Sequence, residues 1–315
     1  MNKRILITGV GGDIGQSVIK CLKDIDGSFN LVGCDIDSFA AGRKLVDRFY
    51  IAPQVKDDSE YISFIERILK EDKVTHVFPV TEWEIEFFNN QRGFFNERAN
   101  IFINKQEIVE TFLDKYETIN FLKKNNLPYP KTYLVDDYKD ELSFPFILKP
   151  RKGCGGKGFV FINNREDLNF FGRKMRDGVI QEIIGSDDDE YTAAVFSTGK
   201  DYYTVAFKRI LGYGSLTKVA RLSDDERIKL LAENIAKAVS LEGSLNIQCR
   251  KTQSGYVPFE INPRLSSTVY LRHFFGFQDV RWWLDFKEGR GVEYMPKFRQ
   301  GVAIRTIGEI FVELV

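Results

Sequence analysis

A glycine turn near the N-terminus constrains the fold of this chain most strongly. Gly9-Val-Gly-Gly-Asp-Ile-Gly15 directly follows an apolar run, Ile5 to Ile7, and opens a helical pattern, Ile14 to Leu22. Glycines let a strand and a helix pack closely through a tight turn, and the helix N-terminus presents backbone N–H groups to an anion. Such a turn is typical of the first strand–helix unit of a parallel sheet.

The residues up to about 110 continue this alternation of strands and helices. Apolar runs at residues 31–34 and 76–80 predict further strands, and the pattern at 61–69 predicts a helix between them. Strands separated by helices indicate βαβ units. We therefore expect an α/β, Rossmann-like domain with a parallel sheet over residues 1–110.

The pattern changes after Pro130, following a predicted helix at residues 115–124. Strands are predicted at residues 133–135, 146–149, 191–197, 202–208, 244–250 and 256–261, with one long helix at 224–241. This arrangement favours an α+β region, in which antiparallel sheets carry helices on one side.

Composition excludes several classes of function. The 45 lysines and arginines balance the 45 aspartates and glutamates, so no overall field draws the chain to nucleic acid or to an anionic membrane. Four scattered cysteines and two histidines disfavour a zinc site or a disulfide framework. The N-terminal residues lack the apolar stretch of a signal peptide. We expect a cytoplasmic protein with small-molecule substrates.

A lysine and a glycine-rich loop provide the first chemical motif. Lys149 ends an apolar strand, and Gly153-Cys-Gly-Gly-Lys-Gly158 follows shortly after it. Gly153, Gly155, Gly156 and Gly158 permit close approach of backbone N–H groups to phosphate oxygens, and Lys157 adds charge. The segment is not a Walker A loop, because G-x-x-x-x-G-K-[ST] is absent. The alternative is a hairpin with solvated lysines.

Two glutamates flank an acidic turn further along the chain. Glu182 follows the apolar run Val179-Ile-Gln, where apolar walls and polar groups are suited to an adenine ring. Glu190 begins the next predicted strand and is a candidate acceptor for ribose hydroxyls. Asp187 to Asp189 are interpreted as a solvated turn, because consecutive turn residues diverge.

Two paired strands carry a third motif. Asn246 and Gln248 share one face of the first strand, while Glu260, Asn262 and Arg264 converge at the end of the second. Carboxylate and amide oxygens suit magnesium bound with nucleotide phosphates, and a guanidinium beside them stabilises a transferring phosphoryl group. The alternative is an ion pair between Glu260 and Arg264.

The three motifs, in this order, resemble the ATP-grasp superfamily, nearest to its carbamoyl-phosphate synthase large-subunit-like branch. The resemblance implies a Rossmann-like domain at 1–110, a small lobe with the glycine loop at 111–180 and a large lobe with the metal site at 181–315. It further implies antiparallel sheets in both lobes and ATP and magnesium as cofactors. Whether manganese can replace magnesium, and whether the protein forms a homodimer, are left open.

The resemblance also implies residue roles. Arg264 and Lys149 would be catalytic, and magnesium would be held by Gln248, Glu260 and Asn262. The residues implied to bind ATP are Lys115, Lys149, Gly153, Gly155, Gly156, Lys157, Gly158, Gln181, Glu182, Ile184 and Glu190. Candidate substrate contacts are Gly11, Gly12, Glu82 and Arg272, of which Glu82 and Arg272 are equally well explained as surface ion-pairing residues.

The implied activity is a carboxylate–amine ligase that forms an acyl phosphate, then a C–N bond, and releases ADP and phosphate. Only one such unit is present, which disfavours complete carbamoyl-phosphate synthesis, and Asn262-Pro-Arg-Leu-Ser-Ser267 departs from the family's Asn-Pro-Arg-Phe-Ser-Gly. Two alternatives stay open. One is an NAD(P)-linked oxidoreductase, since Asp35 follows the glycine turn by about 20 residues; the other is a non-catalytic nucleotide-binding protein.

Overall fold

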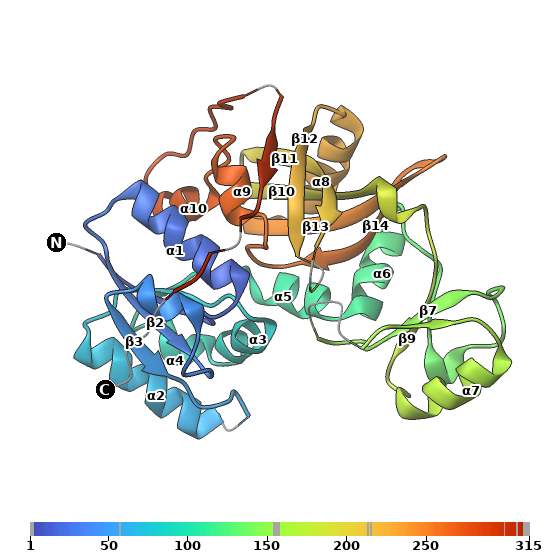
Figure 1. Ribbon diagram of the computed structural model, residues 1–315, viewed down its shortest axis with the longest axis horizontal. Coiled ribbons are helices and arrows are strands. Elements are labelled where there is room, and N and C mark those ends of the chain that lie inside the picture. The colour runs from blue at the N-terminus through green and yellow to red at the C-terminus, as the bar shows by residue number, and fades with distance from the viewer. Residues whose placement is uncertain are drawn as a thin grey trace.

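The computed structural model describes residues 3–56, 58–153, 158–212, 214, 216–298, 300–306 and 308–310. Within these ranges the chain forms three sheets, one parallel and two antiparallel, with helices packed on them (Figure 1). The predicted combination of a parallel-sheet domain with antiparallel sheets is therefore confirmed.

The N-terminal sheet has the strand order β3-β2-β1-β4-β5, with all neighbours parallel. Side chains alternate along β1: Ile5 and Ile7 join the core beneath α1, whereas Leu6 joins the core beneath α2. This period of two explains why both faces carry helices. The elements are β1 (Arg4–Thr8), α1 (Asp13–Ile25), β2 (Asn30–Asp35), β3 (Arg48–Ile51), α2 (Asp58–Glu71), β4 (His76–Phe78), α3 (Glu82–Asn90), α4 (Arg92–Phe95) and β5 (Asn100–Ile101).

Two helices follow, α5 (Gln106–Leu113) and α6 (Lys115–Lys124). Their apolar residues, among them Ile108, Phe112 and Leu122, pack into the core of the six-stranded sheet. Asp114 lies between the helices, and its carboxylate accepts from the backbone N–H groups of Tyr116 and Glu117. This cap fixes the start of α6 at Lys115.

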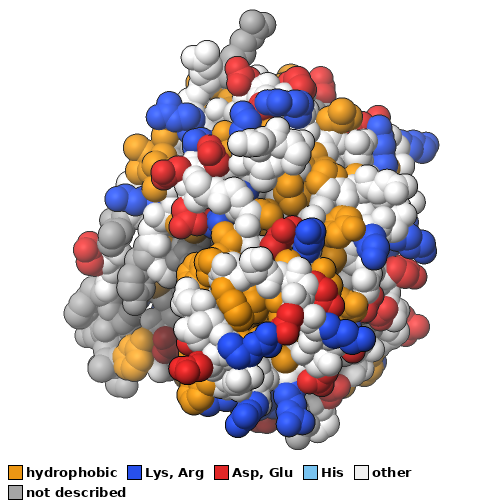
Figure 2. Space-filling view, turned by 90° about the vertical axis from the view of Figure 1, so that its right-hand side faces the viewer, with side chains coloured by type: hydrophobic (Ala, Val, Ile, Leu, Met, Phe, Trp, Pro, Cys, Tyr) orange, Lys and Arg blue, Asp and Glu red, His pale blue; other side chains and the backbone are white. Residues whose placement is uncertain are grey.

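The four-stranded sheet has the order β6-β9-β7-β8 with antiparallel neighbours. Its elements are β6 (Thr132–Leu134), β7 (Phe146–Lys149), β8 (Val160–Ile162), α7 (Arg165–Lys174) and β9 (Val179–Glu182). Strand β9 thus ends two residues after position 180, at which the boundary between the small and the large lobe was expected. Figure 2 views the molecule from this side, and acidic and basic side chains are interspersed over the visible face.

The six-stranded sheet has the order β14-β13-β10-β11-β12-β15. It contains β10 (Glu190–Thr198), β11 (Tyr202–Leu211), β12 (Thr217–Ser223), β13 (Glu242–Thr252), β14 (Gly255–Asn262) and β15 (Val302–Ile304). Helix α8 (Glu226–Ala238) covers one face, and α9 (Val269–His273) and α10 (Asp279–Lys287) lie between the other face and α1 (Figure 1).

Cys21, Cys34 and Cys249 are free and buried. No helix within the described ranges combines the length and apolar character needed to cross a membrane.

Candidate active site

Lys149 lies where the four-stranded sheet meets β14. Its ammonium donates to the amide oxygen of Gln181 at 2.8 Å, on the adjacent strand β9, and lies 3.5 Å from the carbonyl oxygen of Phe259. Burial lowers the pKa of Lys149 from 10.5 to about 8; Glu260 raises it and Lys115 lowers it further. The ammonium is thus held in a confined position with one acid nearby.

Lys115 approaches the same region from α6. Its ammonium donates to the carbonyl oxygen of Gly153 at 2.7 Å, where the glycine loop begins. The preceding residue, Asp114, pairs with Arg151 at 2.7 Å and so ties the helix start to this loop. A hollow opens here, and its lining includes Glu82, Phe112, Lys115, Gly153, Phe259, Glu260 and Asn262.

The end of β14 brings a carboxylate and an amide into this hollow. Glu260 lies opposite Gln248, and Asn262 opposite Asn246, in the β13–β14 register. The side-chain amide of Asn262 donates to Glu260 at 2.9 Å. Burial by itself raises the pKa of Glu260, but Lys115, the Asn262 amide, Lys149 and Arg264 together lower the pKa below its ordinary value. Glu260 is therefore ionised at neutral pH.

Glu190 and Gln248 are already bound to arginines. Arg209 donates to Glu190 through Nε at 2.9 Å and through Nη2, and to the Gln248 amide oxygen at 2.5 Å. Arg250 lies 3.3 Å from the other Glu190 oxygen and also pairs with Asp187. Neither arginine was predicted from the sequence. Arg209 follows Phe207 by two residues on β11, and this spacing places both side chains on the same buried face of the sheet.

The oxygen set fits magnesium in part. Glu260 and Asn262 are adjacent, and each carries an oxygen of the kind that magnesium prefers, although the Asn262 amide nitrogen is the atom that faces Glu260. The amide oxygen of Gln248 accepts from Arg209, so it would have to exchange this partner to become a ligand. No group of three or more acidic, histidine or cysteine side chains suited to a metal occurs among the described residues. A magnesium ion here would depend on phosphate oxygens for the rest of its ligands.

Arg264 directly follows β14 and pairs with Glu82 of α3 at 3.1 Å. The side chains of both residues are 12% exposed, and Nε of Arg264 is buried without a hydrogen-bond partner. The alternative ion pair with Glu260 is not formed, because the guanidinium is turned towards the N-terminal domain. Glu82 and Arg264 thus join the two domains beside the hollow.

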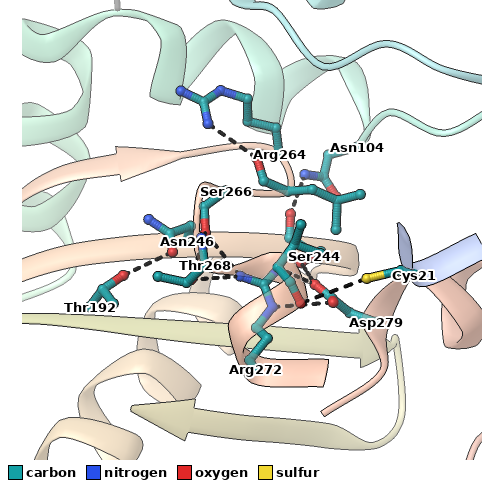
Figure 3. Close-up of polar contacts among 12 residues, drawn as sticks. Cys21, Asn104, Thr192, Ser244, Asn246, Arg264, Ser266, Thr268, Arg272 and Asp279 are labelled. Carbon is teal, nitrogen blue, oxygen red and sulfur yellow. Dashed lines mark hydrogen bonds and ion pairs between the residues drawn. The ribbon is translucent and has the colours of Figure 1, made fainter. Parts of the chain in front are cut away.

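Arg272 lies elsewhere, and the expectation that it contacts substrate is corrected. Its side chain is completely buried, and its guanidinium is engaged by Asp279, Ser266 and Thr268 (Figure 3). A cation in this environment has no free donor surface to offer a ligand. It is part of the buried support behind the segment that carries Arg264.

The glycine turn at the start of α1 is closed by a side chain of the next strand. The backbone N–H of Gly11 donates to Asp35 at 2.7 Å, so this amide is already occupied. A Cβ atom on Gly15 would lie 2.5 Å from the carbonyl oxygen of Gly9, which shows that this glycine is needed for packing. Gly12 is exposed and is the residue before the first turn of α1.

The remaining nucleotide candidates are placed as follows. Glu182 accepts from the backbone N–H of Lys131 at 2.6 Å, and the carbonyl of Ile184 accepts from Arg250 at 3.2 Å. Gly153 and Gly158 have φ angles of 109° and 87°, which glycine tolerates best. Asp187–Asp189 form an exposed turn, as predicted. Gly155, Gly156 and Lys157 lie outside the described residues.

Two known families match successive parts of the chain. Residues 5–102 match the N-terminal domain of PylC-like proteins, and residues 112–268 match the ATP-grasp domain. The chain belongs to the ATP-grasp superfamily. The ATP-grasp match spans Lys115, Glu260 and Asn262, which line the hollow, and also Lys149 and Arg264.

Individual relatives of this ATP-grasp chain are distant. Tetrahydromethanopterin:alpha-L-glutamate ligase of Methanocaldococcus jannaschii is 27% identical over 42% of this chain and 53% of its own length. The arginine-specific carbamoyl phosphate synthase large chain of Neurospora crassa is 24% identical over 85% of this chain and 26% of its own length. The chain therefore spans about half, or about a quarter, of these proteins.

A solved structure shows the same fold. The biotin carboxylase domain of Hydrogenobacter thermophilus 2-oxoglutarate carboxylase superimposes with a TM-score of 0.72 at 18% identity, over 94% of this chain and 72% of that one. That structure is a dimer in complex with magnesium–ADP, ADP and bicarbonate.

Proposed function

We propose that this chain is an ATP- and magnesium-dependent ligase that joins a small carboxylate to an amine through an acyl phosphate. The observation that carries the proposal is the meeting of Lys115, Glu260 and Asn262 at one hollow, with Lys149 and Arg264 close to Glu260. Two lysines suit the phosphates of ATP, and an ionised carboxylate with an amide suits their magnesium.

The nucleotide is proposed to lie between the four-stranded sheet and β14. Lys149 and Lys115 would hold its phosphates, the loop at 153–158 would cover them, and Gln181, Glu182 and Ile184 would line the adenine. Glu190 would accept hydrogen bonds from the ribose hydroxyls, while Arg209 and Arg250 hold the carboxylate of Glu190. We retain residues 1–110 as the proposed N-terminal domain, residues 111–180 as the small lobe and residues 181–315 as the large lobe.

The proposed reaction has two steps. A carboxylate oxygen of the substrate attacks the γ-phosphorus; a new O–P bond forms, and the bond to the ADP oxygen breaks. The amine nitrogen then attacks the acyl carbon; a C–N bond forms, phosphate leaves and the nitrogen loses a proton. Magnesium, held through Glu260 and Asn262, would neutralise phosphate charge. Arg264 and the lysines would position the groups and stabilise charge that develops during transfer.

The acceptor site is proposed beside Arg264 and Glu82, between the N-terminal domain and the segment after β14. The named relatives support the reaction class: one is a glutamate ligase, and the solved neighbour binds magnesium–ADP and bicarbonate. A single ATP-grasp domain match at 112–268 favours one activation step per chain.

Thermal unfolding with nucleotides tests the proposal. Magnesium–ADP and magnesium–ATP are expected to raise the Tm, and NAD is expected to have little effect. In Glu260→Gln the ionic magnesium ligand is lost, so the magnesium-dependent part of the shift should disappear while the fold persists. Glu233→Gln, at a half-buried residue of α8 that pairs with Lys237, is the matched control. Stabilisation by NAD alone would contradict the proposal.

Joint dependence of ADP release on a carboxylate and an amine tests the ligase step. A panel of amino acids and bicarbonate, assayed singly and in pairs, should give ADP release that requires both partners for full turnover. Release that needs only one acceptor, with a phosphorylated product, would identify a kinase instead.

A further inference from the structure

Arg264 is held at its tip but not along its side chain. The guanidinium meets Glu82 and the carbonyl of Leu265, whereas Nε is buried without a partner. Its direction therefore depends on the backbone from which it projects. That backbone, residues 263–268, has no helix or strand of its own. Something outside the segment has to fix it.

A chain of buried hydrogen bonds begins and ends on this segment. Asn104 donates through its side-chain amide to the carbonyl of Pro263 at 2.9 Å and to the carbonyl of Ser244 at 2.8 Å. The Ser244 hydroxyl donates to Asp279 at 2.8 Å. Asp279 pairs with Arg272, whose Nη1 donates to Ser266 at 2.9 Å.

The contacts form a closed ring when the backbone from Pro263 to Ser266 is included. Figure 3 shows the residues Asn104, Ser244, Asp279, Arg272 and Ser266 of this ring. Arg264 lies within that backbone stretch, so the ring holds it from both sides. Arg272 also donates to Thr268 at 3.1 Å, which fixes the end of the segment just before α9. The ring draws on the β5–α5 connection, β13 and α10, all of which are packed elements.

Burial makes the ring stiff. The side chains of Arg272 and Asp279 are 0% and 1% exposed, and an ion pair in such a place is tolerated only when its donors and acceptors are satisfied. Rotation of Ser266 away from Arg272 would leave a buried guanidinium N–H without a partner, which costs about 1–3 kcal/mol. The segment therefore has one strongly preferred arrangement.

We propose that Arg272 is a positioning residue for phosphoryl transfer, because through Ser266 it sets the backbone that aims the Arg264 guanidinium. The inference rests on the proposed function. It assigns Arg272 no contact with substrate, and it gives a role to an arginine that is completely buried.

The test compares two ligand states of the protein. Magnesium–ADP alone measures nucleotide binding; magnesium–ADP with fluoroaluminate mimics the phosphoryl group in transfer, which Arg264 is proposed to contact. Ser266→Ala removes one bond of the ring and keeps the Arg272–Asp279 pair. Ser197→Ala is the matched control, since Ser197 is buried and, among the described residues, its hydroxyl accepts only the local backbone N–H of Gly199 at 2.9 Å.

Ser266→Ala is expected to bind magnesium–ADP within about twofold of wild type and the fluoroaluminate complex about tenfold or more weakly, because small misplacement is costly in transfer. Arg272→Lys keeps the positive charge but lacks the several N–H donors of the guanidinium. It should bind the two ligand states as Ser266→Ala does. In an Arg264→Met background, Ser266→Ala should add less than about twofold, since its effect acts through Arg264.

Three outcomes overturn the inference. One is a Ser266→Ala variant that binds both ligand states as wild type does, and another is an equal loss of fluoroaluminate binding in Ser197→Ala. The third is full additivity with Arg264→Met. A wild-type protein that does not bind magnesium–ADP at all would instead remove the proposed function, and this inference with it.

Discussion

The guanidinium of Arg264 lies 3.1 Å from the carboxylate of Glu82, although 182 positions separate the two residues in sequence. The pair joins the end of β14 to the start of α3 and thereby connects the six-stranded sheet to the N-terminal domain. It also sets the edge of the hollow that Glu260 and Lys115 line.

Replacing Glu82 with Gln is expected to lower the free energy of unfolding by about 1.5–3 kcal/mol, because a hydrogen bond to a largely buried charge is lost. Urea unfolding measures the change. Glu86→Gln on the same helix is the control: Glu86 pairs with Lys152 at 2.7 Å near solvent, and such pairs contribute about 0–1 kcal/mol. Equal losses in both variants would contradict the assignment.

The affinity for magnesium–ADP is expected to fall as pH rises above about 8. Lys149 has its pKa lowered to about 8 by burial, so the free protein loses this proton above that pH. Bound phosphates favour the charged ammonium, so the complex keeps the proton. The affinity is therefore full below pH 8 and falls by up to about tenfold per pH unit above it.

Isothermal titration over pH 7 to 10 measures this dependence. Lys149→Arg stays protonated, so its affinity for magnesium–ADP should decline less as the pH rises. Lys149→Met should bind magnesium–ADP weakly, with an affinity that does not change with pH. A wild-type decline that survives unchanged in Lys149→Arg would assign the titration to another group.

Loss of Arg209 is expected to destabilise the fold strongly. Arg209→Met leaves the 5% exposed carboxylate of Glu190 with Arg250 as its remaining cation, and breaking a buried pair costs about 3–5 kcal/mol. Arg227→Met, at a pair whose arginine is 68% exposed, should cost less than about 1 kcal/mol. Chemical denaturation of both variants provides the comparison. Combining Arg209→Met with Glu190→Gln should cost less than the sum of the two.

Alanine at Gly15 is expected to destabilise the protein, although alanine normally favours a helix. Its Cβ would lie 2.5 Å from the backbone oxygen of Gly9, and overpacking of this kind costs about 1–3 kcal/mol. Gly27→Ala meets no atom within 4 Å and should change stability by about 0.5 kcal/mol or less. A neutral Gly15→Ala in thermal unfolding would show that the turn can shift.

Much of the fold could be predicted because hydrophobic periodicity is local. The strands from 191–197 to 256–261 were placed almost at their observed bounds, since alternating or continuous apolar runs mark them directly. After residue 190, β12, β15, α9 and α10 were missed, and before it β3, α3, α4, β5, α5 and α7 were missed. β15 has three residues, two of them exposed, so its membership of the sheet comes from pairing with β12 and not from its own pattern.

The sequence by itself determined the order of the three motifs and the chemistry they bring: lysines with glycines, then an apolar strand with glutamates, then a carboxylate, an amide and an arginine. The tertiary structure decided which charges meet. It turned Arg264 towards Glu82, placed Arg209 against Glu190 and buried Arg272 against Asp279. The physical reason is that ion pairing depends on burial and on distances across the fold, which neighbouring residues in sequence do not encode.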